Sequence, residues 1–234
     1  MTKLTLRPGN ERGHSQMDWL DSRFSFSFAD YHDPEHMGFL DLRVINDDHI
    51  AVGGGFGMHP HRDMEIITYV IDGKLAHKDS IGTGSTIVPG EIQRMSTGSG
   101  IMHSEFNAGD TPLHLLQIWI MPSARGGAPS YAQKPIDTKS VSGQFGLLAS
   151  PEGGSGLITI KQDANMWLAK LSKGQNTMFD LKPSRGAWAH VVRGDVTIDG
   201  QKLTTGDAAS WIEPGATRFA ANDDSEVLLF DMVQ

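Results

Sequence analysis

The sequence contains no cysteine among its 234 residues. Disulfide bonds, thiolate zinc sites and thiol redox chemistry are therefore excluded, and any metal site must use histidine and carboxylate ligands. The sequence also lacks a run of the ~18 apolar residues that a membrane-spanning helix needs. Its first residues have neither the apolar segment nor the cleavage site of a secretory signal. We therefore expect a cytoplasmic protein without membrane contact.

Clustered positive charge is also missing. No group of five or more lysines and arginines occurs together, and the formal net charge is -8. Because nucleic-acid binding depends on basic patches, we expect no direct contact with DNA or RNA. Long helices are not predicted either, since 27 glycines and 11 prolines place a turn every few residues. This composition is typical of many short strands.

Two pairs of potential metal ligands are present: His59 with His61, and His103 with Glu105. Because side chains alternate along a strand, both members of each pair face the same side. If the two strands line one barrel, three imidazoles and one carboxylate can converge on a single divalent ion of Fe, Ni, Mn, Co, Cu or Zn. Glu65 shares the strand parity of His59 and His61, and spacing alone leaves it open as a rival ligand.

The chain contains an internal duplication. Short apolar or alternating segments separated by Gly, Asp and Pro turns predict an antiparallel barrel within residues 1–122. Residues 123–142 are polar and typical of a connection between domains. Residues 143–234 then repeat the first pattern, with Val191–Val196 similar to Val70–Leu75. We therefore predict an N-terminal metal-binding barrel over 1–122 and a C-terminal barrel over 143–234.

The two predicted barrels differ at the ligand positions. On this pairing, Arg218 falls at the position of His103 and Ala220 at that of Glu105. The second half holds a single histidine, His190. A lone imidazole is more often structural than a ligand, and an arginine would repel a cation. We therefore predict that the C-terminal barrel is free of metal.

A series of distinctive short segments runs from about residue 8 to Met121: Arg12–His14, Asp18–Leu20, Phe24–Ala29, Met37–Leu40, Leu42–Val44, Asn46–Asp48, Gly57–Glu65 and Met95–Glu105. These segments resemble characteristic motifs of the pirin family, within the cupin superfamily. The similarity is particularly close to bacterial pirin-like proteins with quercetin 2,3-dioxygenase activity.

The resemblance implies an all-β bicupin of two antiparallel double-stranded β-helix (jelly-roll) barrels. It implies that His59, His61, His103 and Glu105 bind one divalent transition-metal ion, iron first, with Ni, Cu, Mn, Co or Zn as alternatives. Glu105 would act as the catalytic base, and His14 would lie near the pocket. The implied reaction is ring cleavage of a flavonol such as quercetin by O2 with release of carbon monoxide, in a monomeric protein.

Two other functions remain open from the sequence. One is a non-catalytic, metal-binding and redox-sensing regulatory protein that acts through protein partners. Eukaryotic members of the pirin family resemble regulators of this kind. The other is an isomerase or sugar-binding cupin, which the pirin-like N-terminal segments disfavour. Five further histidines of the first half are interpreted as surface or locally hydrogen-bonded residues: His14, His32, His36, His77 and His114. Some of the phenylalanines between Phe24 and Phe28 are expected to line an apolar pocket for a flat aromatic ligand.

Overall fold

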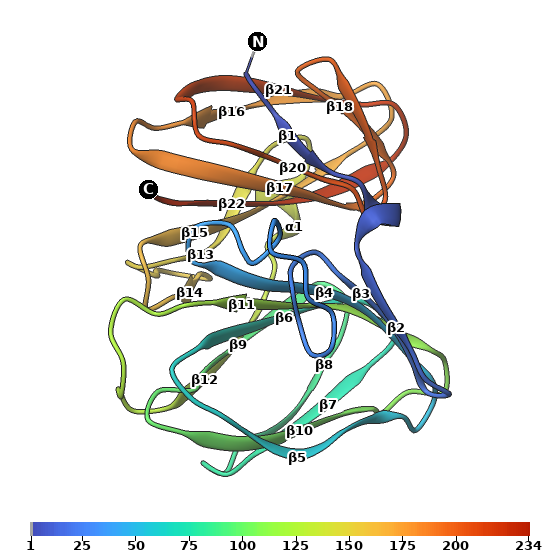
Figure 1. Ribbon diagram of the computed structural model, residues 1–234, viewed down its shortest axis with the longest axis vertical. Helices are drawn as coiled ribbons and strands as arrows, with labels where there is room; N and C mark the ends of the chain where they lie inside the picture. Colours follow the sequence, from blue (N-terminus) through green and yellow to red (C-terminus); the bar gives the residue numbers. More distant parts are fainter. Residues whose placement is uncertain (1) are drawn as a thin grey trace. The chain divides into compact units, whose positions relative to one another are not determined.

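The computed structural model describes residues 2–234; Met1, with which the predicted N-terminal domain begins, lies outside the described residues. The chain forms two compact units, and each is a barrel of two sheets whose strands pair antiparallel, apart from the parallel pair β13 and β14 (Figure 1). The first barrel comprises Gly13–Ile136 and Ile160–Gln162. The second comprises the residues up to Arg12, together with Asp137–Thr159 and Asp163–Gln234. The predicted all-β, two-barrel architecture is confirmed.

The first barrel has a larger sheet of seven strands, in the order β12-β9-β6-β11-β4-β3-β2, and a smaller sheet of four, in the order β5-β10-β7-β8. The bounds of these strands are β2 Gly13–Gln16, β3 Leu20–Phe24, β4 Leu42–Ile50, β5 Gly55–His61, β6 Glu65–Asp72, β7 Leu75–Asp79, β8 Gly84–Ile87, β9 Glu91–Ser96, β10 Ile101–Asn107, β11 Leu113–Ile120 and β12 Ser130–Pro135.

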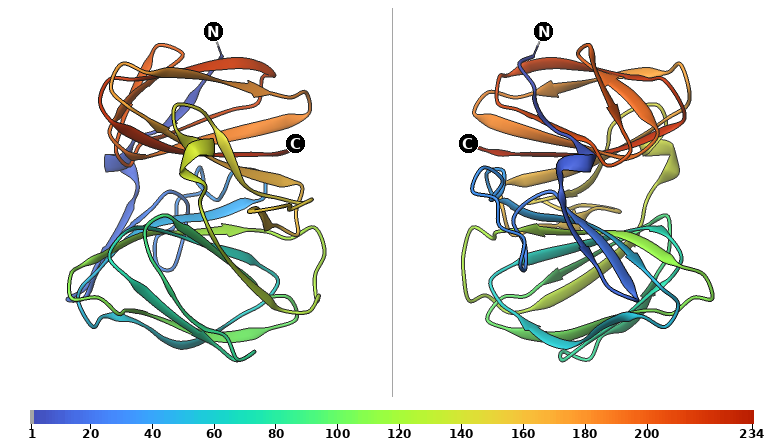
Figure 2. Two further views of the ribbon diagram at one scale, coloured as in Figure 1. Left: turned by 180° about the vertical axis from the view of Figure 1, so that it is seen from behind. Right: turned by 45° about the vertical axis from the view of Figure 1, so that its right-hand side comes forward.

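The second barrel repeats this arrangement. Its larger sheet has the order β1-β20-β17-β22-β15-β13-β14, and its smaller sheet has the order β16-β21-β18-β19 (Figure 2). The elements are β1 Thr5–Arg7, the 3-10 helix η1 Gly9–Glu11, α1 Thr138–Val141, β13 Gly146–Ser150, β14 Ile158–Thr159, β15 Ala164–Leu171, β16 Asn176–Leu181, β17 Arg185–Arg193, β18 Asp195–Ile198, β19 Gln201–Thr204, β20 Ala208–Trp211, β21 Gly215–Ala221 and β22 Ser225–Val233.

The edge strands correct the predicted domain boundaries. Strand β1 pairs with β20 of the second barrel, with Leu6 opposite Ala209, so the first residues of the chain belong to that barrel. Strand β12, within the predicted connection 123–142, pairs with β9 and belongs to the first barrel. An unpaired edge strand exposes backbone donors and acceptors, and in each barrel a segment from outside the predicted domain covers them.

Matching glycine turns fix the same hairpin in both barrels. Gly73 follows β6 with φ +86°, and Gly194 follows β17 with φ +91°. A Cβ atom at Gly73 would lie 2.9 Å from the Cα of Leu113, and one at Gly194 would lie 2.3 Å from the carbonyl oxygen of Asp224. Only glycine combines this backbone conformation with so close an approach. The two turns therefore give a common reference for comparing strand positions.

The apolar side chains of the strands form the core of each barrel. In the first barrel, β6 is buried along its whole length except for its last residue, which explains its almost continuous apolar sequence. In the second barrel, a continuous buried cluster includes Phe179, Leu181 and Phe219. Among residues 2–234, no helix has the length and apolar character needed to cross a membrane.

Candidate metal centre

Strands β5 and β10 bring the predicted ligand pairs together. They pair antiparallel, with His103 directly opposite His59 and Ile101 opposite His61. The register shifts between His103 and Glu105, where β5 carries an extra residue. Such bulges re-aim side chains and occur often beside functional sites. The sequence pattern of alternating ligands is thus realised on two neighbouring strands of the smaller sheet.

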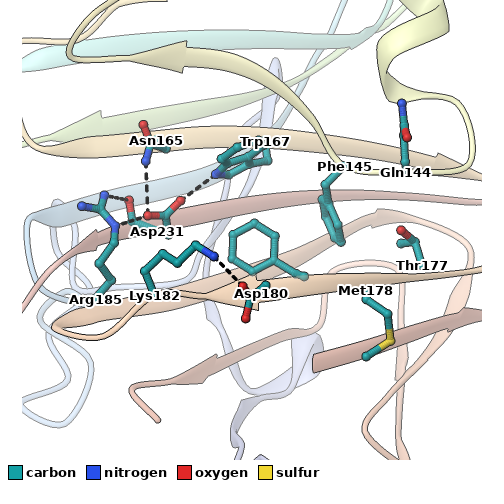
Figure 3. A pocket seen from close by; sticks show the side chains of 11 residues that line it. Gln144, Phe145, Asn165, Trp167, Thr177, Met178, Asp180, Lys182, Arg185 and Asp231 are labelled. Carbon is teal, nitrogen blue, oxygen red and sulfur yellow. Dashed lines mark hydrogen bonds and ion pairs between the residues drawn. The ribbon is translucent and has the colours of Figure 1, made fainter. Parts of the chain in front are cut away.

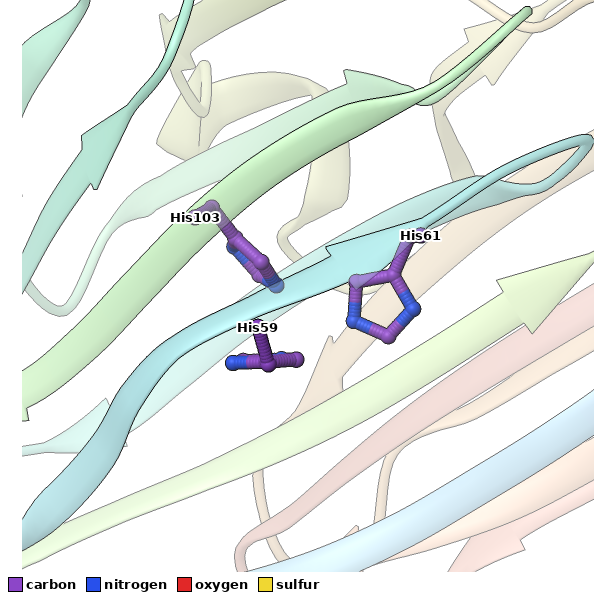
Figure 4. A group of neighbouring side chains, drawn as sticks. All are labelled: His59, His61 and His103. Atoms are coloured by element: carbon purple, nitrogen blue, oxygen red, sulfur yellow. The ribbon is translucent and has the colours of Figure 1, made fainter.

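The three histidines form a compact cluster (Figure 4). Ring centroids are 4.7 Å apart for His59 and His61, 4.4 Å for His59 and His103, and 4.9 Å for His61 and His103. One nitrogen from each ring lies within 4.8 Å of a nitrogen from the others. His59 Nδ1 is 2.7 Å from the carbonyl oxygen of Gly57, so it donates and leaves Nε2 with the lone pair.

Glu105 belongs to a second, overlapping group. Its carboxylate lies within 4.8 Å of ligand atoms of His103 and His77, and it does not join His59 and His61 in one cluster. Glu105 Oε2 accepts a hydrogen bond of 2.5 Å from Gln117 Nε2, and Oε1 lies 4.0 Å from His77 Nδ1. Gln117 therefore fixes one carboxylate oxygen and leaves the other facing the histidines.

Burial controls the protonation of these groups. Burial, together with the neighbouring rings of His59, His61 and His77, lowers the pKa of His103 to about 2. Burial, followed by the charge of His59, lowers the pKa of His61 to about 4. Burial also raises the pKa of Glu105 to about 8, against the opposing hydrogen bond from Gln117. His61 and His103 are therefore neutral near pH 7, the form in which histidine binds metal.

The histidine cluster opens into a pocket of about 290 Å³ in the first barrel. Aromatic rings of Phe24, Phe28, Phe56 and Trp119 line it, together with polar side chains on β3, β4 and β11. The expectation that some phenylalanines between Phe24 and Phe28 line an apolar pocket is thus met by two of them. Strand β3 ends at Phe24, so the residues that follow it, including Phe28, do not continue this strand.

The structure places several other candidate residues away from the cluster. Glu65 is buried beside Arg94, 3.8 Å from its Nε, and accepts a backbone hydrogen bond from Lys161, so it is a cross-strand ion-pair partner. His14 pairs with Asp21 through a contact of 2.9 Å and does not line the pocket. The expectation that His14 lies near the cavity is therefore wrong for its side chain, because Ser15 is the β2 residue that faces inward.

His77 and Gln117 are the site residues that the sequence reasoning missed. His77 was interpreted as a surface or local residue, yet it is 2 % exposed and its Nε2 lies 3.2 Å from Asp79. Gln117 lies on β11, outside both ligand motifs, and it reaches Glu105 only because the strands of the barrel bring β11 close to β10. Only the alternation of His77 with Asp79 after the glycine turn could have indicated a buried polar position.

The second barrel has different residues at the positions equivalent to those of the histidine cluster. Counting from the glycine turns, His77 corresponds to Ile198; His77 pairs with Glu105, and Ile198 pairs with Phe219. Phe219 therefore stands at the position of Glu105.

The remaining ligand positions follow from the same registers, and they correct the predicted pairing. Thr217 lies opposite Phe179, just as His103 lies opposite His59, so Thr217 corresponds to His103 and Phe179 to His59. Leu181 lies opposite the first residue of β21, and His61 lies opposite the first residue of β10, so Leu181 corresponds to His61. The four positions are thus occupied by Phe179, Leu181, Thr217 and Phe219. The prediction that Arg218 and Ala220 hold them is wrong by one residue, which moves each to the other face.

A cavity of about 620 Å³ also lies in the second barrel, against Phe145 and Trp167 (Figure 3). Its charged side chains are paired within the lining. Asp231 accepts a hydrogen bond of 2.6 Å from Trp167 Nε1 and also pairs with Arg185, and Lys182 pairs with Asp180. Such mutual pairing is typical of a structural network.

The first barrel's cluster retains unpaired polar atoms. Both ring nitrogens of His103, Nδ1 of His77 and Oε1 of Glu105 are buried without a hydrogen-bond partner among residues 2–234. Each such atom costs about 1–3 kcal/mol, and a bound cation would remove this cost for the atoms that it contacts. Imidazole and carboxylate donors suit first-row divalent ions. The residues therefore fit a divalent transition-metal ion.

Two consecutive barrels of this topology, one of them with a histidine-lined pocket, define a bicupin protein. The chain belongs to the pirin family: residues 6–120 match the family model described as Pirin, and residues 147–232 match that described as Quercetinase C-terminal cupin domain.

Relatives cover the whole length of the chain. A protein of Escherichia coli strain K12 named quercetin 2,3-dioxygenase is 47% identical, over 98% of each chain. A pirin-like protein of Caulobacter vibrioides is 39% identical, over 96% of this chain and 97% of the relative. The crystal structure of the bacterial pirin YhhW from Escherichia coli in complex with nickel(II) has a TM-score of 0.93 and 45% identity, covering 99% of both chains.

Proposed function

We propose that the chain is a metal-dependent dioxygenase that cleaves the heterocyclic ring of a flavonol such as quercetin with O2 and releases carbon monoxide. The observation that carries this proposal is the set of unpaired, buried ligand atoms at the end of an aromatic-lined pocket. The names of relatives that are 47% and 41% identical, which include quercetin 2,3-dioxygenase, support the choice of substrate class.

In this proposal His59, His61, His103 and Glu105 hold one divalent ion, with iron as the first candidate. When bound, the ion would supply Lewis acidity toward the substrate's 3-hydroxyl oxygen and a centre for O2 chemistry. His61 and His103 are neutral near pH 7 and bind it without adding charge. The nickel(II) complex of the Escherichia coli relative supports a divalent ion and leaves its identity in this chain to experiment.

Glu105 takes the proton of the flavonol's 3-hydroxyl group. Glu105 is the carboxylate that lies beside the histidine cluster, which suits it to act as a general base toward a hydroxyl group bound there. Gln117 holds Oε2, so Oε1 is the atom that accepts the proton. Trp119 Nε1 in turn donates to Gln117 Oε1 at 3.2 Å, which orients the amide.

The pocket walls bind and shield the substrate. Phe24, Phe28, Phe56 and Trp119 offer ring faces and edges against which a planar ring system packs. The same side chains exclude bulk water from the reacting atoms. Asn46, which also lines the pocket, has a buried Oδ1 without a partner among the described residues, and it accepts a hydrogen bond from a substrate hydroxyl group.

The test uses protein stripped of metal and reloaded separately with Fe(II), Ni(II), Cu(II), Mn(II), Co(II) or Zn(II). Aerobic loss of quercetin absorbance and release of carbon monoxide are measured together for each ion. We expect metal-dependent consumption with carbon monoxide release, and its loss in His61→Ala and Glu105→Ala. His32→Ala is the matched control, because His32 is an exposed histidine outside the pocket.

Tight metal binding without turnover under any ion would refute the dioxygenase. That outcome would favour the alternative of a metal-binding regulatory protein that acts through protein partners. Quercetin consumption without carbon monoxide would refute the proposed ring cleavage and leave a different oxidation at the same site.

A further inference from the structure

A second group of potential ligands lies on the outer face of the first barrel's larger sheet. Side chains of β4 alternate, so Asn46 and Asp48 line the pocket while Asp47 and His49 face the other way. On the neighbouring strand β11, His114 is the direct partner of His49. One strand therefore carries pocket residues on one face and two metal-capable side chains on the other.

Asp47, His49 and His114 are already close together. His114 Nε2 lies 2.7 Å from Asp47 Oδ1, and the rings of His49 and His114 stack with centroids 3.9 Å apart. One ligand atom from each of the three residues lies within 4.8 Å of the others. His49 is exposed, so an ion can reach this group from solvent.

The neighbouring strands add negative charge around the group. Asp21 on β3 is the partner of His49, and Asp72 on β6 is the partner of His114. Asp21, Asp47 and Asp72 all act electrostatically on His49. Arg23 on β3 lies opposite Asp47 and places a positive charge in the same row of residues. Three carboxylates near two imidazoles attract a cation, which one arginine offsets only in part.

We propose that Asp47, His49 and His114 form a second metal site, separate from the pocket, for a divalent ion of the nickel, copper and zinc group. Two imidazoles and one carboxylate are donors that these ions bind, and water or a neighbouring carboxylate completes the coordination shell. The site does not depend on the proposed function, because none of its ligands lines the pocket.

Binding requires a small side-chain movement. A tetrahedral ion with bonds near 2.0–2.1 Å brings its donor atoms to roughly 3.3 Å from one another. His114 and Asp47 are already within that distance, and His49 must turn out of its stacked position. Among residues 2–234, no side-chain hydrogen bond holds His49 against this rotation, and the exposure of His49 leaves space for it.

The experiment counts ions on tag-free protein. After removal of all metal, Zn2+ bound per chain is measured by equilibrium dialysis and elemental analysis. We expect two ions in the wild type, one in His49→Ala/His114→Ala, one in His59→Ala/His61→Ala and two in the His32→Ala control. His49→Ala alone keeps the test valid if the double variant fails to fold, because His49 is exposed.

Electron paramagnetic resonance of Cu2+ identifies the ligands. In the His59→Ala/His61→Ala background, we expect nitrogen hyperfine splitting from two imidazoles, and we expect adding His49→Ala to abolish this two-nitrogen pattern. A single ion in the wild type that His49→Ala/His114→Ala retains would overturn the proposal. So would two ions retained in His49→Ala/His114→Ala, or a copper spectrum that His49→Ala leaves unchanged.

Discussion

The two barrels share a strand order and a glycine turn but differ in what fills the equivalent positions. In the first barrel, β5 and β10 carry three imidazoles and a carboxylate, several of whose atoms have no partner among residues 2–234. In the second, β16 and β21 carry Phe179, Leu181, Thr217 and Phe219, and all four are buried. The same backbone thus supports a polar pocket in one case and a packed apolar core in the other.

The pairing of the strands differs accordingly. The first barrel has a register shift between His103 and Glu105, whereas β16 pairs with β21 without interruption from Asn176 to Leu181. Thr217, the one polar residue of the second set, shares a hydrogen bond of 3.1 Å with the hydroxyl group of Thr2. A core needs satisfied polar groups, while a binding site keeps unsatisfied ones for its ligand.

The largest effect is expected from a matched pair at the central ligand position. His103→Ala should abolish metal retention and flavonol turnover, because changes to residues that merely support a ligand already cost roughly 10- to 100-fold. Thr217→Ala, at the equivalent position, should leave both unchanged and cost about 1 kcal/mol of stability from its lost hydrogen bond. Metal content and quercetin consumption check both variants. A loss of metal in Thr217→Ala would contradict the comparison.

A second pair separates stability from activity. Phe219→Ala should lower the free energy of unfolding by about 3–5 kcal/mol, because it leaves a cavity in the second barrel's core. Turnover per folded molecule should be unchanged. Glu105→Gln should remove turnover without lowering the stability of the metal-free protein, since it replaces a buried carboxylate by a neutral amide.

Urea unfolding and steady-state turnover of both variants distinguish these outcomes. Full turnover by Glu105→Gln would exclude Glu105 as the base. Reduced activity per folded molecule in Phe219→Ala would mean that the second barrel contributes to the reaction.

A third substitution replaces a residue of the first barrel by the residue at the equivalent position of the second barrel. Gln117 is opposite Thr68 in the first barrel, and Leu229 is opposite Ala189 in the second. Thr68 and Ala189 precede their glycine turns by the same number of residues, so Leu229 corresponds to Gln117. Gln117→Leu should lower kcat roughly 10- to 100-fold with a smaller change in KM, because it frees Glu105 Oε2 and removes from the aromatic walls only the hydrogen bond of Trp119, not its ring. Gln117→Glu, which keeps an acceptor but loses the amide donor, should behave similarly. Unchanged kcat in both variants would rule out a positioning role.

The smallest effect concerns acid stability of the second barrel. Asp199 accepts hydrogen bonds from the backbone nitrogens of Arg218 and Thr2. Burial raises its pKa, but these hydrogen bonds outweigh burial and hold the pKa below its usual value of 3.8. The unfolded chain therefore binds the proton first, so this contribution is present above pH 3.8 and is lost as pH falls through the lower folded pKa.

Asp199→Asn should consequently flatten the fall in unfolding free energy at low pH. Urea unfolding of the wild type and the variant at several pH values between about 3 and 6 measures the slope. An identical slope in both proteins would mean that the hydrogen bonds to Asp199 do not affect folding.

The sequence by itself determined the class of the fold and the core of the site. Glycine turns, short apolar segments and the internal repeat predicted two all-β barrels, because local pattern and turn chemistry depend on neighbouring residues alone. The alternation of His59 with His61, and of His103 with Glu105, predicted shared faces for the same reason.

Tertiary structure decided what depends on pairing between distant strands. Leu6 and the segment around Lys134 fill sheet edges that no local pattern assigns. His77 and Gln117 reach Glu105 only because β7 and β11 lie in the same barrel as β10. The one-residue error at Arg218 has the same origin, since register is set by hydrogen bonds across strands and a slip of one residue exchanges the faces.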